Sequence, residues 1–170
     1  AVRKLNMLAN LMQRRISDNQ ENLAVAYEIH GQMDQSVTKD MASWYNKELE
    51  SHRELDILRG STSRGPHHDD IVLTVNGVNL RSFGSQGQQR TSVLSLKLAE
   101  LEFLRSETGE YPVLLLDDVM SELDVTRRHQ LLSFIRKEHI QTMITATDEA
   151  YFPKERIGTY HYVKAGSIVR

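Results

Sequence analysis

Residues 113–124 read V-L-L-L-D-D-V-M-S-E-L-D, and this stretch decides the fold. Four consecutive apolar residues stand between Pro112 and a pair of acids. A short apolar run bounded in this way predicts a β-strand buried on both faces, as in the parallel sheets of α/β proteins. The sequence therefore predicts an α/β fold with parallel strands, one of which ends in two carboxylates.

Asp117 and Asp118 follow that predicted strand directly. Open α/β sheets bind ligands at the carboxyl ends of their strands, so the two acids fall where a phosphate chain and its metal would lie. One carboxylate can hold a hydrated Mg²⁺, and a second can orient or deprotonate an attacking water. The same residues also fit a strand that ends in a solvated acidic turn, and the pattern alone leaves both interpretations open.

A second distinctive segment, F-G-S-Q-G-Q-Q-R, occupies residues 83–90 and leads into a helical pattern. The helix is indicated by residues that recur at i, i+4, i+7 and i+11, namely Leu94, Leu98, Leu101 and Arg105. Ser85 is a good N-cap, Gly87 lets a ligand approach the backbone, and the free amides of a helix start favour an anion. The segment therefore predicts a phosphate contact, although an ordinary capped helix with a Gly-rich lead-in fits as well.

The remaining elements are predicted from periodicity and turn residues. Helices are expected over 1–17, 37–58 and 125–138, strands over 23–29 and 140–145, and hairpins over 71–81 and 160–169. In the first helix the expected buried face holds Leu5, Leu8, Leu11 and Met12. In the second it holds Met41, Trp44, Tyr45, Leu49, Leu55 and Leu58. Trp44 and Tyr45 fit a buried stripe better than a surface that stacks on DNA bases.

Residues 67–70, H-H-D-D, combine side chains that can bind a metal. Neighbouring side chains diverge on an extended backbone, so adjacent residues chelate one ion poorly. A metal role for His67, His68, Asp69 and Asp70 is therefore disfavoured.

Bulk properties exclude several classes of protein. The chain has 170 residues, a formal net charge of −2 and no cysteine, so it offers no disulfide, no thiolate metal site and no overall charge for nucleic acid. Its length suits one compact domain, or one lobe with an appendage. No apolar run approaches the length of about 20 residues that spans a membrane, and no signal peptide is recognisable. We therefore expect a soluble, cytoplasmic protein with no membrane partner.

Taken together, the two distinctive segments are much more specific than either alone. A Ser-x-Gly-Gln-Gln turn before a long helix, then a strand ending in D-D, then V-M-S-E-L-D, resembles the C-terminal lobe of an ABC-type ATPase, where the signature loop, Walker B strand and D-loop follow in this order. The sequence of these motifs is more similar still to that of the RecF family of SMC-like recombination mediators, and the resemblance runs from about Leu58 to the C-terminus. The resemblance implies the C-terminal lobe of an ABC/SMC-type ATPase head over residues 59–170. It also implies part of a mainly helical second domain over residues 1–58. That part resembles RecF by its position and by the sequence A-Y-E-I-H-G at residues 26–31.

This resemblance implies ATP and Mg²⁺ as cofactors and assigns roles to the matching residues. Contacts to the nucleotide of an opposite protomer would come from Ser85, Gly87, Gln88 and Gln89. Asp117 would hold the metal, Asp118 would polarise the attacking water, and the D-loop would comprise Ser121, Glu122, Leu123 and Asp124. Thr147 is a catalytic candidate because it stands where ABC ATPases carry a histidine, and its hydroxyl implies slow hydrolysis. His68 stands where the family has arginine, so a titratable ring replaces a permanent cation.

The implied function is DNA repair, recombination, replication and the SOS response. ATP would drive a homodimer that loads at gapped DNA or single/double-strand junctions and recruits RecR, possibly with RecO. No G-x-x-x-x-G-K-[ST] motif occurs here, so the resemblance implies an N-terminal Walker A lobe that completes the head. We expect slow ATPase activity only in that combination and after dimerisation, and none from this chain alone. The alternatives are another SMC-like head ATPase, or a non-catalytic module that binds a partner through the helices of residues 1–58.

Overall fold

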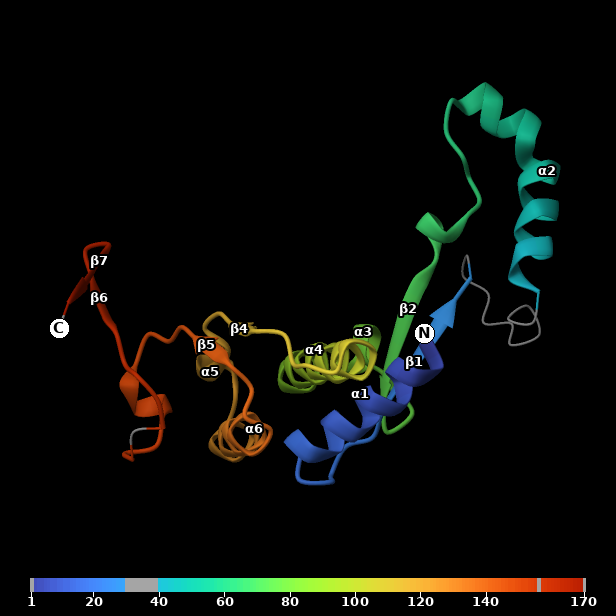
Figure 1. Ribbon diagram of the computed structural model, residues 1–170. Coiled ribbons are helices and arrows are strands. Elements are labelled where there is room, and N and C mark those ends of the chain that lie inside the picture. The colour runs from blue at the N-terminus through green and yellow to red at the C-terminus, as the bar shows by residue number, and fades with distance from the viewer. Residues whose placement is uncertain (1, 30–39, 156, 170) are drawn as a thin grey trace. The chain divides into compact units, whose positions relative to one another are not determined.

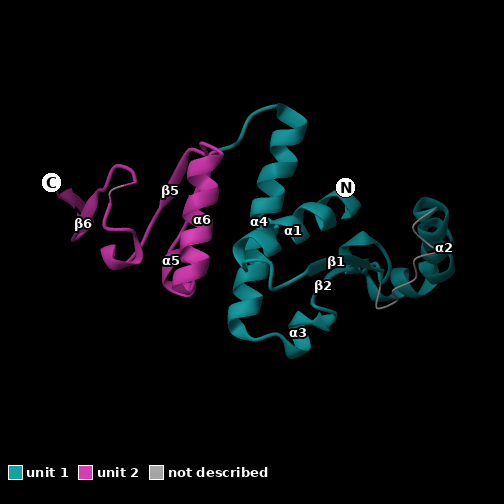
Figure 2. Cartoon of the chain, turned by 90° about the horizontal axis from the view of Figure 1, so that it is seen from below, with its two compact units in different colours: residues 1–112 teal, residues 113–170 magenta. Residues whose placement is uncertain are grey.

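The computed structural model describes residues 2–29, 40–155 and 157–169. Contacts divide the chain into two compact units, residues 1–112 and 113–170 (Figure 2). The resemblance implied a lobe boundary at residue 58, which stays a prediction, and the boundary between the two compact units lies at Pro112. It lies there because the first helix packs on the long helix that follows the Ser85 turn, so residues on both sides of position 58 share one core.

The first unit combines helices with an antiparallel sheet (Figure 1). Its elements are α1 (Val2–Ile16), β1 (Leu23–Glu28), α2 (Met41–Arg59), the 3₁₀ turn η2 (Pro66–His68), β2 (Asp70–Val75), β3 (Val78–Asn79), α3 (Leu80–Phe83) and α4 (Gln86–Thr108). The sheet order is β1-β2-β3. The predicted hairpin turns at Asn76 and Gly77, whose φ values of 49° and 81° suit a tight two-residue turn. Its second arm is short because Asn79 caps α3, accepting from the Arg81 N–H at 2.9 Å.

The core of the first unit lies where α1 packs against α4 and β1. Met12 and Leu98 are fully buried there, with exposed fractions of 1% and 0%. Ser92 and Ser95 on α4 are also fully buried. The prediction for Leu11 was wrong, because this side chain is 52% exposed and lies off the stripe that Ala9, Met12 and Ile16 form.

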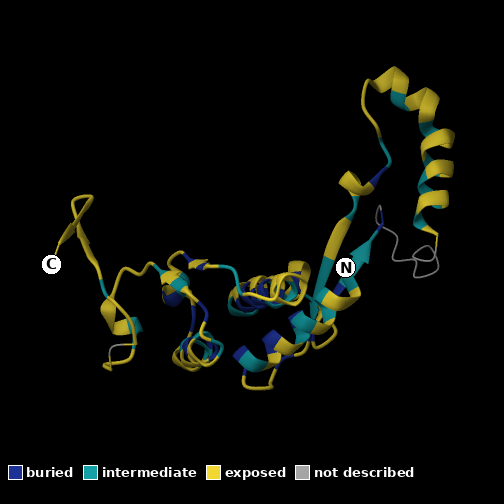
Figure 3. Ribbon diagram, in the orientation of Figure 1, coloured by how far each residue is buried: buried dark blue, intermediate teal, exposed yellow. Residues whose placement is uncertain are grey.

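Helix α2 buries none of its residues, so the predicted apolar stripe was wrong (Figure 3). Met41, Trp44 and Tyr45 are half-buried, while Leu58 is 83% exposed. Polar contacts hold the helix instead, since the hydroxyls of Tyr27 on β1 and Tyr45 on α2 both donate to Asp69 Oδ2. Burial, together with the Asp69 carboxylate, raises the pKa of both phenols. The Tyr45 ring lies edge-on to Trp44 at 5.0 Å, and its hydroxyl is committed to Asp69.

Within its described residues, the second unit contains two separate pairs of strands. Its elements are β4 (Leu114–Leu116), α5 (Val119–Glu122), α6 (Val125–Lys137), β5 (Thr142–Ile144), η3 (Glu149–Tyr151), β6 (Tyr162–Lys164) and β7 (Ser167–Val169). β4 and β5 pair in parallel, with Leu115 opposite Met143, which confirms the predicted parallel strands. β6 and β7 form the predicted terminal hairpin around Ala165 and Gly166.

Only one face of the β4–β5 pair is buried, so the prediction of a strand covered on both faces was wrong. Leu114 and Leu116 are 7% and 6% exposed and belong to the core of this unit. The alternation of a strand puts Leu115 on the opposite face, where it is 69% exposed beside Met143 at 67%. Among the described residues, nothing packs over that second face well enough to bury it.

No helix of the described residues is long and apolar enough to cross a membrane.

Replacing Leu98 by alanine tests the α1–α4 core. The substitution removes a fully buried side chain, so we expect the free energy of unfolding to fall by about 2–5 kcal/mol. Val93→Ala on the same helix is the matched control, because Val93 is 56% exposed and should change stability by less than about 0.5 kcal/mol. Urea unfolding followed by circular dichroism measures both. Equal losses in the two variants would contradict the assigned packing.

Candidate functional site

The acidic edge of the second unit is built by a threonine that joins two strands. The parallel register places Leu116 opposite Ile144, so the residues that follow each strand meet at one edge. The Thr145 hydroxyl donates to Asp117 Oδ1 at 2.5 Å and accepts from the Asp118 N–H at 3.0 Å. The Thr145 N–H also donates to the carbonyl of Leu116 at 2.9 Å. Both acids are exposed, and Thr145 fixes the peptide that carries them.

Sequence reasoning missed Thr145, while Thr147, which it selected by the resemblance to ABC ATPases, stays a prediction. The structure places Thr147 two residues beyond Thr145, exposed in a bend. A signal for Thr145 was present, because the first residues after two neighbouring parallel strands share an edge. That rule pairs Thr145 with Asp117 once β4 and β5 are taken as neighbours.

The two acids differ in how the chain holds them. Asp118 has a φ of 49°, a left-handed conformation that aspartate adopts more readily than most residues. Its carbonyl accepts from the Ser121 hydroxyl at 2.8 Å, and its carboxylate makes no capping bond to α5. The Asp117 carboxylate, in contrast, is oriented by Thr145. Two exposed carboxylates suit Mg²⁺, which protein sites usually bind through one or two carboxylates, waters and substrate phosphates.

The predicted D-loop follows as a short helical turn. Leu123 is 4% exposed, and Asp124 caps α6 by accepting from the Arg127 N–H at 2.8 Å. Ser121 and Glu122 are exposed. The loop is thus anchored at its carboxyl end and presents its first two side chains to solvent.

A basic cluster of Arg127, Arg128 and His129 lies at the start of α6, and its two arginines contact neighbouring groups. Arg127 Nη1 donates to Asp124 Oδ2 at 3.0 Å. Arg128 Nε donates to the carbonyl of Leu123 at 2.8 Å, and its guanidinium lies 4.6 Å from the centre of the Tyr151 ring. His129 is exposed. These two arginines therefore brace the loop that precedes them.

In the first unit, Ser85 is the N-cap of α4, as predicted, within a complete capping box. Its hydroxyl oxygen accepts from the Gln88 N–H at 3.2 Å, and Gln88 Oε1 accepts from the Ser85 N–H at 3.1 Å. Ser85 and Gln86 are exposed, and Gly87 is half-buried. The Ser85 hydroxyl proton and the Gln88 NH₂ group can still donate to a ligand, because both capping bonds use oxygen atoms of these side chains as acceptors.

Gln89, the other predicted ligand of this turn, uses its side chain within the protein. Its Nε2 donates to the carbonyls of Leu80 at 3.0 Å and Gly84 at 3.2 Å. Ser85 and Asp117 belong to different compact units.

The H-H-D-D segment is divided among separate contacts. The His67 and His68 rings lie 4.2 Å apart, and His68 Nε2 contacts the Thr62 carbonyl at 2.8 Å. Asp69 accepts from two tyrosines, and Asp70 pairs with Arg81 at 3.2 Å. No group of three or more His, Cys, Asp or Glu among the described residues is placed to hold a metal.

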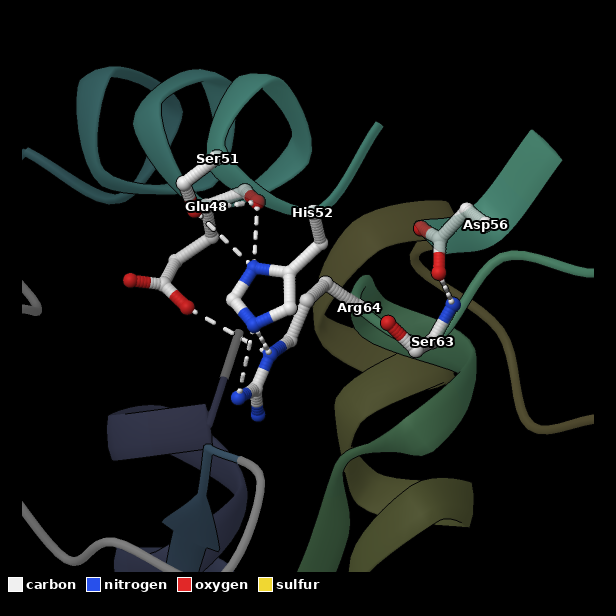
Figure 4. Close-up of polar contacts among 6 residues, drawn as sticks. All are labelled: Glu48, Ser51, His52, Asp56, Ser63 and Arg64. Carbon is white, nitrogen blue, oxygen red and sulfur yellow. Dashed lines mark hydrogen bonds and ion pairs between the residues drawn. The ribbon is translucent and has the colours of Figure 1, made fainter. Parts of the chain in front are cut away.

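A further polar cluster ties residues 60–65 back onto α2 (Figure 4). Arg64 Nη2 contacts His52 Nε2 at 3.2 Å, and Arg64 Nε lies 3.4 Å from Glu48 Oε2. His52 Nδ1 faces the Glu48 carbonyl at 2.9 Å, so Nδ1 carries the ring proton and Nε2 accepts from the guanidinium. The Ser51 hydroxyl donates to the same carbonyl at 2.9 Å. This hydroxyl is thus bonded to the backbone, and the cluster serves to close the loop.

The parallel β4–β5 pair, of which β4 ends in paired acids, and the capped helix α4 match the fold of SMC-type ATPase heads. A solved structure of an SMC ATPase aligns over 99% of this chain and 82% of its own length, with a TM-score of 0.54 at 11% identity. At that identity the likeness shows the fold.

The chain belongs with the RecF proteins. RecF of Halothermothrix orenii is 48% identical over 158 residues, covering 92% of this chain and 41% of the relative. RecF of Oenococcus oeni is 42% identical over 171 residues, covering 99% and 45%. A solved structure of the recombination mediator RecF, from the RecFOR pathway, aligns over 98% of this chain and 43% of its own, with a TM-score of 0.71 at 35% identity. No protein-family model matches. The chain spans about two fifths of the length of the curated relatives that it matches.

Thr145→Val tests the bridge at the acidic edge. The change removes the bonds to Asp117 and Asp118 while nearly keeping side-chain volume, so we expect a loss of about 1 kcal/mol in the free energy of unfolding. Thr147→Val is the matched control, since Thr147 is exposed beyond the bridge, and Thr145→Ser should retain the bonds. Urea unfolding of the three variants decides the matter. A larger loss for Thr147→Val than for Thr145→Val would refute the assignment.

Proposed function

We propose that this chain contributes the phosphate-contacting turn and the acidic edge of an ATP-operated RecF head that acts in DNA repair. The capped Ser85 turn, which keeps hydrogen-bond donors for an anion, supports this most directly. In this proposal residues 59–170 are the C-terminal lobe of the head, and residues 1–58 are part of its helical second domain. A solved RecF–ATP structure aligns over 86% of the chain at 37% identity, which supports ATP as the nucleotide.

The turn before α4 would contact the γ-phosphate of ATP bound mainly by the opposite protomer. The first amides of a helix have no partner within the helix, and the helix dipole adds positive potential there. The Gln88 N–H is used by the Ser85 oxygen. The phosphate contacts therefore fall to the Ser85 hydroxyl proton, the Gln88 NH₂ group and the amides around Gly87.

The acidic edge would serve the metal and the attacking water. Asp117, oriented by Thr145, would hold Mg²⁺ through water, and Mg²⁺ would neutralise charge on the phosphates. Asp118, whose carboxylate makes no cap to α5, would polarise the attacking water. Thr147 would take the place of the histidine of ABC ATPases. Because a threonine hydroxyl is neither protonated nor deprotonated near neutral pH, unlike an imidazole, hydrolysis would be slow.

ATP would thus hold two copies of the protein together. Residues 121–124 would carry the state of one nucleotide site to the other, since their exposed beginning follows Asp118 and their anchored end caps α6. The output would be loading at DNA gaps or junctions, with recruitment of RecR and RecO, in cytoplasmic repair, recombination, replication and the SOS response. Catalysis would require the Walker A lobe, for which the open face at Leu115 and Met143 offers an apolar surface.

A second candidate function is a protein-interaction module centred on α2. The exposed side chains Leu55, Ile57 and Leu58, with no buried residue in the helix, favour it. Under this alternative, removing the Asp117 carboxylate would leave every measurable activity intact. A different SMC-like head is disfavoured by the 48% identity to RecF.

Two substitutions at Ser85 test the phosphate contact in a full-length RecF protein that carries these residues. Aspartate and asparagine are both good N-caps, so each should preserve α4. Ser85→Asp places a negative charge against the γ-phosphate, and we expect ATP-induced dimerisation to be lost while each protomer still binds ATP. Ser85→Asn should retain more of the dimerisation. Sedimentation velocity with and without ATP–Mg²⁺ measures this, and normal dimerisation of Ser85→Asp would defeat the proposed function.

Asp118→Asn tests the acidic edge in the same protein. The amide cannot take a proton from water, so we expect hydrolysis to fall by roughly 10²–10⁴-fold while the ATP-bound dimer persists longer. Glu155→Gln, an exposed carboxylate of the same unit, is the charge-matched control. The measurements are single-turnover phosphate release and dimer lifetime. Hydrolysis at the unmodified rate would remove Asp118 from the mechanism.

A further inference from the structure

The Gln89 side chain forms hydrogen bonds that hold the turn before α4 in place. It is not among the groups to which the proposed function assigns the phosphate contacts. Gln89 follows Ser85 by one helical turn, and its backbone N–H donates to the Ser85 carbonyl at 2.9 Å. Its side-chain Nε2 donates to the Leu80 carbonyl at 3.0 Å and the Gly84 carbonyl at 3.2 Å. Gln89 thus donates hydrogen bonds to the carbonyls of Leu80, Gly84 and Ser85.

Leu80 connects these Gln89 hydrogen bonds to the core of the first unit. It is 4% exposed, and its carbonyl accepts from the Gly84 N–H at 3.1 Å as well as from Gln89. A Cβ atom at Gly84 would lie 2.6 Å from that carbonyl oxygen, so only glycine fits there without displacement. The position of Ser85 is therefore fixed by the hydrogen bond from Gly84 to the carbonyl of the buried Leu80. Gln89 adds a second hydrogen bond to the same carbonyl.

We propose that Gln89 is a positioning residue for the phosphate-contacting turn and is not itself a nucleotide ligand. Its amide has two N–H bonds, and two backbone carbonyls face the nitrogen that carries them. The remaining polar atom is an oxygen that only accepts, which a phosphate oxygen does not bind. The inference rests on the proposed function of Ser85, and it separates Gln89 from the ligands with which the sequence grouped it.

The adjacent glutamine has the opposite arrangement. Gln88 uses its side-chain oxygen on the Ser85 N–H, so its NH₂ group is left for a ligand. The consecutive glutamines therefore have different roles, because Gln88 keeps its NH₂ group for a ligand while Gln89 donates to two backbone carbonyls.

Gln89→Met in a full-length RecF protein that carries these residues tests the positioning role. Methionine has a similar shape and no donor, so the turn loses both side-chain bonds. We expect ATP-induced dimerisation to weaken about tenfold, while ATP binding to single protomers is unchanged. Gln89→Glu, which sets a carboxylate against two carbonyls, should weaken dimerisation further. Gln20→Met is the matched control, the same substitution at an exposed position of the same unit outside the turn, and should dimerise normally.

Two further measurements separate positioning from a loss of folding. Amide hydrogen exchange over residues 85–89 should be faster in Gln89→Met than in Gln20→Met, while the melting temperatures stay close. Gly84→Ala, which pushes the turn off the Leu80 carbonyl by contact, should reproduce weakened dimerisation with intact ATP binding.

The outcomes are distinguishable from those for Ser85. If Gln89→Met dimerises like Gln20→Met while Ser85→Asp does not dimerise, the positioning role is wrong and the proposed function stands. Equal losses of single-protomer ATP binding and dimerisation in Gln89→Met would also overturn the role. If Ser85→Asp dimerises normally, the proposed function itself fails.

Discussion

The parallel pairing of β4 with β5 is the constraint on which the acidic edge depends. In a parallel pair both strands run toward the same edge, so the residue after each strand arrives at the same place. Thr145 therefore lies next to both acids. Its hydroxyl donates to the Asp117 carboxylate and accepts a hydrogen bond from the Asp118 N–H. A slip of one residue in register would remove both bonds. Strand register and chemistry are therefore fixed by the same contact.

The second site follows from the unsatisfied amides at the start of α4. A helix leaves its first N–H groups without intrahelical partners, and a side chain, water or ligand must serve them. Here the Ser85–Gln88 capping box serves one of these N–H groups. In the proposed function a rigid lead-in matters, because donors hold an anion best when they keep their positions. The Gly84–Leu80 contact supplies that rigidity from the core.

Periodicity and turn chemistry predicted the elements well, because these signals are local. The Asn76-Gly77 hairpin and the Ser85 cap are examples, each set by a few adjacent residues. Burial was predicted less well, because it depends on which elements lie opposite. Leu58 and Leu115 have apolar side chains at positions that suit a core, yet each is exposed here. Thr145 was missed for a related reason, since its partners are joined through strand pairing rather than through nearby sequence.

The exposed face of the β4–β5 pair bears directly on how the acidic edge works. Full burial of a leucine or methionine side chain is worth about 1.5–3 kcal/mol, and Leu115 and Met143 realise little of this in the described chain. Their strands are short, and each places only three residues in the pair. The acids at the end of such a pair are held by the Thr145 bridge and a core on one side. Covering the second face would bury Leu115 and Met143 and stiffen both strands, and with them the peptide that carries Asp117 and Asp118. The geometry of the acidic edge therefore depends on packing at Leu115 and Met143 as well as on the Thr145 bridge.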